Sequence, residues 1–432
     1  MLRYFRGGKK MKAESSSKMK SRTYDMVVIG GGAAGLAGAV KAAELGMDVV
    51  VLESGERIGG IPMQCIHPGF GNFYYRENLT GPEFSERLIE KVKRMEIECH
   101  TRAHVEGIRH VSDTENMVSV VMPAGIMQIR AKTILYAAGA RERHAYEIGI
   151  TGDRVSGVYT AGEAQTLMDI YGIMPGKSVV IIGSGDIGLI MARRFALEGA
   201  DVKAVVEMLP YPGGLQRNVV QCLEDFDIPL LTSHMVTRIV GKKRVERVIL
   251  AEVDESFRAI KNSEKEIDCD TVALAAGLVP NIGKLREADI DIDSATNGPV
   301  VNEYMETSLP GVFAAGNALA INDYVDYAAE QGEQAAIGAH LFIEGNMPSD
   351  WKPIRKGENI RLVFPHHISG GRDVKIYARV KKPVRDAVVE FPEIDKRVRK
   401  RAVMPGEMII VNLKKQETAG IDELTLRCAD GN

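Results

Sequence analysis

The fold of this chain is decided near its start by Tyr24-Asp25-Met26-Val27-Val28-Ile29-Gly30-Gly31-Gly32-Ala33-Ala34-Gly35. The apolar run before the glycines is typical of a strand buried on both faces. Gly30 permits a tight turn, Gly32 leaves room for a pyrophosphate, and Gly35 lets the next helix pack closely on the strand. The free N–H groups and dipole of that helix, predicted over residues 33–45, favour an anion at its start. The stretch therefore predicts a βαβ dinucleotide-binding unit, with Ala33 and Ala34 at the nucleotide.

An acidic residue follows this unit where a ribose needs it. The run 49–52 predicts a second strand, and Glu53 closes it 23 residues after Gly30. A carboxylate at this position hydrogen-bonds the ribose diol of a dinucleotide.

The same pattern recurs in the middle of the chain. Predicted strands over 180–182 and 202–206 flank a helix over 187–197, and Glu207 follows 24 residues after Gly183. The glycines could serve the two turns for packing alone, but two complete units imply two nucleotides and electron transfer between them. A 2′-phosphate would meet the Glu207 carboxylate, and no Lys or Arg follows before Arg217, so NADH is favoured over NADPH. The predicted contacts of this second site are Gly183, Ser184, Gly185, Asp186, Ile187, Gly188 and Glu207.

Composition bounds the class of protein. The 432 residues are 45% hydrophobic and 26% charged, with a net charge of −3, and this length suggests about three domains. The charge argues against nucleic acid or bulk membrane attraction as the main role, and no apolar run reaches the ~18 residues of a transmembrane helix. Five scattered cysteines without a CxxC fit a reducing cytoplasm and exclude the usual zinc and iron–sulfur spacings. His366-His367 has no further ligand spacing, so no metal is predicted.

Residues 1–23 are basic and lack the apolar segment of a secretory signal. We predict a disordered extension, with contact to an anionic surface as the alternative. Met11 or Met19 could equally be the true start.

Three more runs predict how the two units are joined. The buried strands over 133–139 and 271–277 both end in Ala-Ala-Gly, and a short strand over 310–317 precedes a small-residue helix over 324–340. This order predicts an α/β fold in which one Rossmann-like domain, residues 153–277, is inserted into another, residues 24–152 and 278–348. The strand ends and the helix start add Ala138, Gly139, Ala276, Gly277, Gly316, Asn317 and Val325 to the predicted cofactor contacts.

The last part of the chain alternates apolar and polar residues. Runs over 374–380, 408–413 and 423–428, separated by glycine-containing turns, predict a small antiparallel β domain over 351–432. The basic cluster 396–401 is interpreted as a solvated strand face or turn, with a docking patch for an acidic partner as the alternative.

Taken together, the Gly30–Gly35 fingerprint with Glu53, then Gly59-Gly60, the inserted second fingerprint and the late Ala-Gly-Asn resemble the two-dinucleotide-domain flavoproteins, the superfamily of glutathione reductase, thioredoxin reductase and NADH oxidase. The resemblance covers residues 24–345. It implies FAD in the first domain, NAD(P)H in the second, and a helix start facing the flavin pyrimidine. Asn317 stands where the family has an Asp at the ribityl chain, and an amide can still hydrogen-bond there.

One departure from that pattern concerns chemistry. The disulfide reductases place two cysteines near the Gly-Gly or a CxxC in the NADPH domain, whereas the segment 59–71 has Cys65 alone. Disulfide exchange needs a second thiol, so disulfide reduction is disfavoured. Cys65 could cycle through a sulfenate beside the flavin or be a packing residue, and His67 is a candidate acid/base.

A narrower similarity comes from the segments 157–165, 175–177 and 209–218, which resemble the NADH-type flavoprotein subunits of opine oxidases, hydrogen cyanide synthase and related amine dehydrogenases. The segments 79–83 and 209–218 look nearer to prokaryotic flavoproteins that accompany a glycerol-3-phosphate-oxidising flavoprotein. The resemblance implies a homo- or hetero-oligomer with a second flavoprotein or an iron–sulfur subunit.

Three functions follow as hypotheses. The first is an FAD-containing, NAD(H)-linked electron-transfer subunit of a dehydrogenase whose partner oxidises glycerol 3-phosphate. The second is a self-sufficient NADH oxidase or peroxidase that uses Cys65. The third is a nucleotide-binding scaffold or redox sensor without turnover.

Overall fold

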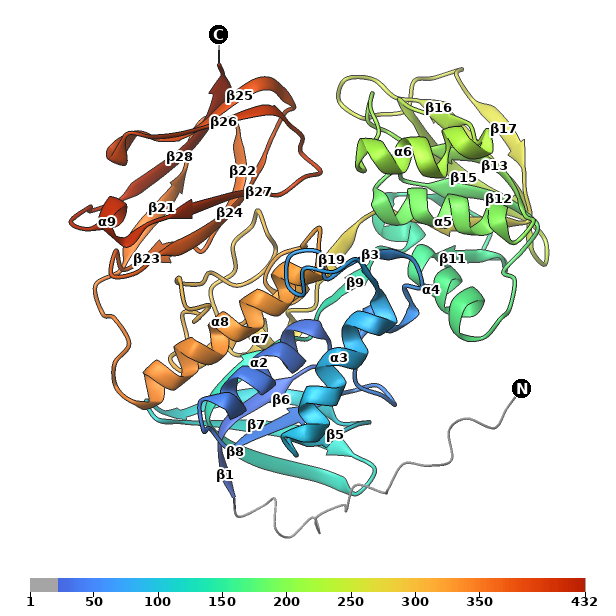
Figure 1. Cartoon of the computed structure of the whole chain (residues 1–432). Helices are drawn as coiled ribbons and strands as arrows, with labels where there is room; N and C mark the ends of the chain where they lie inside the picture. The colour runs from blue at the N-terminus through green and yellow to red at the C-terminus, as the bar shows by residue number, and fades with distance from the viewer. Residues whose placement is uncertain (1–21, 432) are drawn as a thin grey trace.

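The computed structural model describes residues 22–431, which form three lobes (Figure 1). Most of the predicted extension, residues 1–21, lies outside the described residues. The structure differs from the prediction at Arg22 and Thr23, the last two residues of that extension. Thr23 begins strand β1 (Thr23–Ile29), and Arg22 forms an ion pair of 2.6 Å with Asp48, so both belong to the folded chain.

The first lobe is built on a sheet with strand order β5-β2-β1-β8-β7-β6, and β20 pairs with β8. β1 lies between β2 and β8 and is parallel to both, while β6, β7 and β8 form antiparallel hairpins. Met26 to Val28 are fully buried because helices and hairpins cover both faces. The other strands are β2 (Val49–Leu52), β5 (Glu98–His100), β6 (His104–Ser112), β7 (Glu115–Met122), β8 (Gly125–Tyr136) and β20 (Val312–Ala314).

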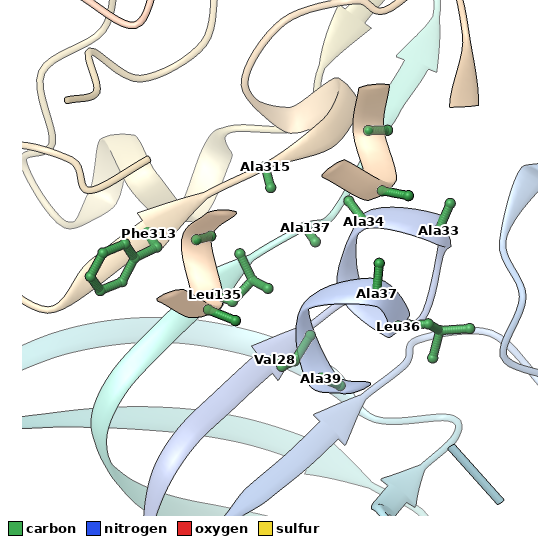
Figure 2. Packing of buried hydrophobic residues seen from close by; sticks show 14 of the residues in the cluster. Val28, Ala33, Ala34, Leu36, Ala37, Ala39, Leu135, Ala137, Phe313 and Ala315 are labelled. Atoms are coloured by element: carbon green, nitrogen blue, oxygen red, sulfur yellow. The ribbon is translucent and has the colours of Figure 1, made fainter. Parts of the chain in front are cut away.

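Small residues bring the helices of this lobe close to one another. The helices α2 (Ala33–Glu44) and α8 (Val325–Ile343) cross where a Cβ on Gly332 would lie 2.0 Å from the backbone oxygen of Ala34. Figure 2 shows alanines of α2, with Leu135 and Phe313, in one hydrophobic cluster, to which Ala328, Ala329, Ala335 and Ala336 of α8 also belong. The amphipathic α3 (Gly81–Arg94) lies beside α2 and begins with a capping box from Thr80 and Glu83.

The second lobe repeats the parallel arrangement. Its five-stranded sheet has the order β11-β18-β12-β13-β14, and a four-stranded sheet, β10-β15-β16-β17, packs behind it. The elements of the main sheet are β11 (Val158–Thr160), β12 (Ser178–Ile182), β13 (Asp201–Val206), β14 (Leu230–Leu231) and β18 (Thr271–Leu274), with α4 (Ala161–Gln165), the π-helical turn η3 (Thr166–Ile170), α5 (Asp186–Leu197), α6 (Gln216–Cys222) and η4 (Glu224–Phe226). The second sheet contains β10 (Thr151–Gly152), β15 (His234–Gly241), β16 (Val245–Glu252) and β17 (Lys265–Asp268).

The chain passes between these two lobes twice, and the two passages lie side by side. β9 (Ala140–Glu142) pairs antiparallel with β19 (Leu278–Pro280). The fold class predicted from the two fingerprints is thus confirmed, with the second Rossmann-like unit inserted into the first. Short elements complete these lobes: η1 (Ile61–Gln64), β3 (Pro68–Phe70), β4 (Leu79–Thr80), η2 (Ala145–Ile148), α7 (Gly283–Glu287) and η5 (Gly316–Ala318).

The third lobe is a β domain of two sheets, with strand orders β22-β24-β27 and β23-β21-β28-β25-β26. One strand pair differs from the predicted antiparallel pattern, because Ile354 to Lys356 run parallel to Leu424 to Leu426. A parallel pair needs a long crossover, which the rest of the domain supplies. The elements are β21 (Lys352–Lys356), β22 (Ile360–Phe364), β23 (His367–Ile368), β24 (Val374–Val380), β25 (Val384–Phe391), η6 (Pro392–Ile394), β26 (Lys396–Val403), β27 (Ile409–Leu413), α9 (Lys415–Thr418) and β28 (Leu424–Asp430).

This β domain packs on the first lobe, with β24 against α8. Phe364 and Tyr377, stacked 4.8 Å apart, belong to the same hydrophobic cluster as α2 and α8. The basic cluster 396–401 lies on the edge strand β26, where Arg397, Arg399 and Arg401 are exposed. The cluster is therefore exposed on a strand face, and the docking patch for an acidic partner stays a prediction. Within residues 22–431 no helix is both long and apolar enough to cross a membrane.

Candidate functional site

In each glycine turn, the first and last glycines are required by the chain itself. Gly30 has φ 104°, and a Cβ there would lie 2.4 Å from the Ala137 oxygen, while a Cβ on Gly35 would lie 1.9 Å from the Gly30 oxygen. The second turn repeats these contacts, since Gly183 has φ 100° and a Cβ on Gly188 would lie 2.1 Å from the Gly183 oxygen. The turn and the tight helix–strand packing account for glycine at these four positions. These glycines are therefore no evidence for a bound ligand.

The middle glycines are different. Gly32 and Gly185 have ordinary extended backbones, with φ −84° and −64°. A Cβ on Gly32 would come no nearer than 3.8 Å to any atom, and one on Gly185 would meet nothing within 4 Å. Each is the N-cap of its helix, α2 or α5, without a side-chain cap, so N–H groups stay available. The chain leaves both positions open where a pyrophosphate would lie, and the residues present fit two dinucleotides.

The two predicted acidic residues each lie against their own glycine turn. Glu53 accepts hydrogen bonds from Gly31 N at 2.7 Å and from Gly55 N at 2.5 Å. Glu207 is buried and accepts bonds from Ser184 N at 2.9 Å and Ser184 Oγ at 2.6 Å. Both carboxylates therefore stand at the strand end beside the helix N-terminus, the place expected for a ribose contact.

A cavity of about 510 Å³ lies between the first two lobes and gathers many of the predicted residues. The first lobe contributes the start of α2 and of α8, and the second contributes α4 and the first turns of α5. Its lining includes the predicted residues Gly32, Ala33, Ala34, Cys65, His67, Gly139, Ile187, Gly316, Asn317 and Val325. The cavity is the place where groups held by both domains would meet.

The other predicted residues are not among those that line this cavity. Gly60 supports the first turn, since a Cβ there would lie 2.7 Å from Gly32 Cα, and Gly59 N donates to Gly31 O at 2.7 Å. Gly277, at φ 88°, lies in the passage back to the first lobe, where its oxygen accepts from Arg143 N. Those outside the lining are Gly30, Gly35, Glu53, Gly59, Gly60, Ala138, Gly183, Ser184, Gly185, Asp186, Gly188, Glu207, Ala276 and Gly277.

Cys65 reaches the cavity as a protonated thiol. Burial raises the pKa of Cys65 to about 12, and the Asp169 carboxylate adds to the shift. Its Sγ lies 3.7 Å from Gln165 Oε1, and none of the described cysteines forms a disulfide. His67 lies at the same wall, 5.3 Å from the Phe70 ring between centroids, with Nδ1 3.0 Å from the Pro68 oxygen. No hydrogen bond joins Cys65 to His67 among the described contacts.

Three polar residues that the sequence did not single out join the two lobes at this wall. Gln64 Nε2 donates to Gly162 O and to Gln165 Oε1, both at 3.2 Å, and Thr166 Oγ1 donates to Gln64 Oε1 at 2.8 Å. Thr166 begins the π-helical turn, a feature common at functional sites. The one feature of the sequence that could have pointed to Gln64 as a site residue is its position next to Cys65.

Asn317, which replaces the expected Asp, is held by its neighbours. Its Oδ1 accepts from Asn322 N at 3.0 Å, and Gly316 N donates to the buried Gln331 Oε1 at 3.0 Å. With the oxygen used, the Asn317 amide presents its N–H₂ group as a donor. Among the described residues no group of three or more His, Cys, Asp or Glu side chains could hold a metal ion.

Comparisons with known proteins agree with this geometry. A family model for pyridine nucleotide-disulphide oxidoreductases matches residues 24–335. An opine oxidase subunit of Agrobacterium tumefaciens is 26% identical over 73% of this chain and 65% of its own length. Mitochondrial dihydrolipoyl dehydrogenase of Caenorhabditis elegans is 28% identical over 68% and 63%. The chain thus spans under two thirds of the length of these curated relatives.

A solved structure also shares the fold. Thioredoxin reductase of T. acidophilum superposes with a TM-score of 0.63 at 24% identity and covers 75% of this chain and 99% of its own. At this identity the likeness concerns the arrangement of the chain.

Proposed function

The chain belongs to the pyridine nucleotide-disulphide oxidoreductase family, and from that premise we propose that it is an FAD-dependent oxidoreductase that exchanges hydride with NAD(H) and passes electrons on as one subunit of a larger dehydrogenase. The observation that carries this proposal is the pair Gly32 and Gly185. Both are glycine without a conformational or packing reason, both stand at an uncapped helix start, and the cavity runs between their helices.

In this proposal bound FAD supplies the hydride chemistry, and the chain supplies binding and orientation. Gly32 and Glu53 would hold the adenosine half, and Asn317 with the start of α8 at Val325 would bind the ribityl and ring portions. Gly185 and Glu207 would hold the nicotinamide dinucleotide. The hydrogen bonds of Gln64 with Gly162 and Thr166 connect the two lobes at the cavity wall.

NADH is the proposed dinucleotide. The Glu207 carboxylate disfavours a 2′-phosphate by charge repulsion, and its backbone and hydroxyl donors hold it in place. NADPH should therefore bind more weakly than NADH.

The role as one subunit is supported by two facts. The relative from Agrobacterium tumefaciens is itself named as a subunit. Cys65 forms no disulfide and is the one cysteine of segment 59–71, so the adjacent pair that a disulfide relay uses is missing there. Glycerol 3-phosphate as the partner's substrate stays a prediction, since none of the relatives compared above is named for it. A cytoplasmic location is likewise a proposal, which rests on the scattered cysteines of the sequence.

The test is anaerobic titration of the purified chain, reconstituted with FAD, by NADH and by NADPH. We expect loss of flavin absorbance with NADH at lower concentration than with NADPH, and weak turnover on organic substrates until a partner protein is added. Full-rate substrate oxidation by the isolated chain would contradict the subunit role. A preparation that stays colourless after incubation with FAD would contradict the flavoprotein assignment and favour the scaffold.

The alternative, an NADH oxidase or peroxidase that uses Cys65, needs a thiolate. The raised pKa of Cys65 disfavours that form near neutral pH. Under this alternative Cys65→Ser abolishes oxygen and peroxide turnover, whereas under the proposed function it has little effect on flavin reduction by NADH.

A further inference from the structure

A second cavity, of about 220 Å³, lies between the inserted domain and the C-terminal β domain and has no part in the function proposed above. One wall is the loop that follows Glu207, and the other is formed by β22, β24 and the loop after β26. The residues used below are Gly213 and Gly214 on the first wall and Arg361, Arg379, Gly406 and Glu407 on the second.

The first wall is bonded directly to the second dinucleotide turn. Gly213 N donates to Ser184 Oγ at 2.9 Å, and Gly214 N donates to Ser184 O at 2.8 Å. The same Ser184 hydroxyl donates to Glu207 Oε2 at 2.6 Å. One side chain therefore separates this wall from the carboxylate proposed to bind the adenosine ribose.

The second wall is in backbone contact with the first. A Cβ on Gly406 would lie 2.3 Å from the Gly213 oxygen, so any larger residue at position 406 would separate the two domains. The β domain thus places its own side chains at the edge of the nucleotide-binding domain.

The two arginines on the second wall differ in how their charges are balanced. Arg379 is buried and forms an ion pair with Asp323. Arg361 is exposed at the cavity edge and donates one long bond, 3.5 Å, to the Pro405 oxygen. Across residues 22–431 no carboxylate lies within ion-pair distance of Arg361.

The charge of Arg361 is consequently left without a counter-ion. Partial burial and the neighbouring Arg379 charge lower the pKa of Arg361. Glu407 lines the same cavity, but burial and the Asp323 and Asp186 charges raise the pKa of its carboxyl. A partly desolvated guanidinium beside a second one favours binding of an anion.

We propose that Arg361 binds a phosphate group of the dinucleotide held by the inserted domain, so that the C-terminal β domain completes the second nucleotide site. This inference rests on the proposed function. A guanidinium binds phosphate oxygens in bidentate fashion, and the phosphate is either the pyrophosphate shared by all adenine dinucleotides or a 2′-phosphate.

The test is calorimetric binding of ADP-ribose and of 2′-phospho-ADP-ribose to the full FAD-loaded chain and its Arg361→Gln variant. Arg399→Gln is the matched control, because it removes the same charge from an exposed position on β26 of the same domain. Flavin absorbance of each variant reports that the first nucleotide site is intact.

We expect Arg361→Gln to weaken binding by about 10-fold or more, the size of a charge-assisted hydrogen bond, while Arg399→Gln changes it less than about twofold. An equal loss for both ligands assigns the pyrophosphate, whereas a loss confined to the second ligand assigns the 2′-phosphate and would contradict the proposed preference for NADH. Unchanged binding to Arg361→Gln, or an equal loss in Arg399→Gln, would overturn the inference and leave the proposed function standing. Failure of the unaltered chain to bind either ligand would overturn both.

Discussion

Arg379 of the C-terminal β domain forms a buried ion pair with Asp323, which directly precedes the cavity-lining residue Tyr324. Arg379 Nη2 also donates to the Ile321 oxygen at 3.1 Å, and Asp323 Oδ2 accepts from Met408 N at 2.5 Å. The β domain therefore holds the loop between η5 and α8, which forms one wall of the proposed flavin cavity.

Replacing Arg379 by Met should destabilise the protein by about 3–5 kcal/mol, because it leaves the Asp323 carboxylate buried without a partner. Urea unfolding measures the loss. The double variant Arg379→Met/Asp323→Leu should recover most of it, since no buried charge is then left unpaired. Arg399→Met, at an exposed position, should stay within about 0.5 kcal/mol of the parent. A double variant no more stable than Arg379→Met would contradict the ion-pair argument.

Gly32→Ala and Gly185→Ala should each abolish one nucleotide site without harming the fold. Neither Cβ meets a chain atom within 3.4 Å, and both backbones are in a region open to alanine. Stability should be unchanged or raised by about 0.4–1 kcal/mol. Flavin absorbance should be lost only in Gly32→Ala, and NADH binding should be lost in Gly185→Ala.

Gly35→Ala is the contrasting control for this pair, because its Cβ would lie 1.9 Å from the Gly30 oxygen. The Gly35→Ala variant should either not fold or have a much lower melting temperature. If Gly32→Ala retained flavin with full affinity, the open space at position 32 would not be a ligand space.

Cys65 should be unreactive toward thiol reagents near neutral pH. Its pKa of about 12 leaves almost no thiolate below pH ~9, and thiolate is the reacting form. Iodoacetamide labelling followed by peptide mass mapping should show a rate at Cys65 that rises with pH up to the limit of protein stability. Rapid labelling at pH 7 would revive the peroxidase alternative.

Acid should loosen the contact between the β domain and the first lobe. Burial alone would raise the pKa of Asp293, but His366 at 3.7 Å and Lys356 at 3.2 Å outweigh it and hold that pKa well below its usual range. The folded-state pKa is thus lower than the unfolded one, so this stabilisation is present above pH ~4 and is lost as the pH falls further.

Urea unfolding between pH 7 and pH 3 tests this linkage. Asp293→Asn should be less stable than the parent at pH 7, and the difference should shrink toward pH 3. Parallel stability curves for the two proteins would show that Asp293 does not contribute to the acid response.

The elements around the glycine turns could be predicted because their signals are local. The helix expected over 33–45 is α2 (Ala33–Glu44), and that expected over 187–197 is α5 (Asp186–Leu197). In both, a buried apolar run meets a glycine whose conformation or packing the turn requires, and such features need only neighbouring residues. The strand expected over 374–380 matches β24 for the same reason.

The contacts between lobes could not be predicted in this way. Gln64 and Thr166 are 102 residues apart, and Arg379 and Asp323 are 56 apart. No periodicity links such positions, because the fold alone brings them together. The parallel pairing of β21 with β28 could not be predicted either, because alternation of apolar and polar residues indicates a strand but not the direction of its neighbour. The predicted roles of Cys65, His67 and the cofactor contacts stay predictions.

The stacking of Phe364 and Tyr377 within the core shared with α8 means that the last eighty or so residues are not a detachable module. Expressing the nucleotide-binding part alone would expose the hydrophobic surface of α8 that the β domain covers, and such a patch promotes aggregation. Fusion tags and linkers are better attached after β28, where Asp430 and Gly431 are exposed.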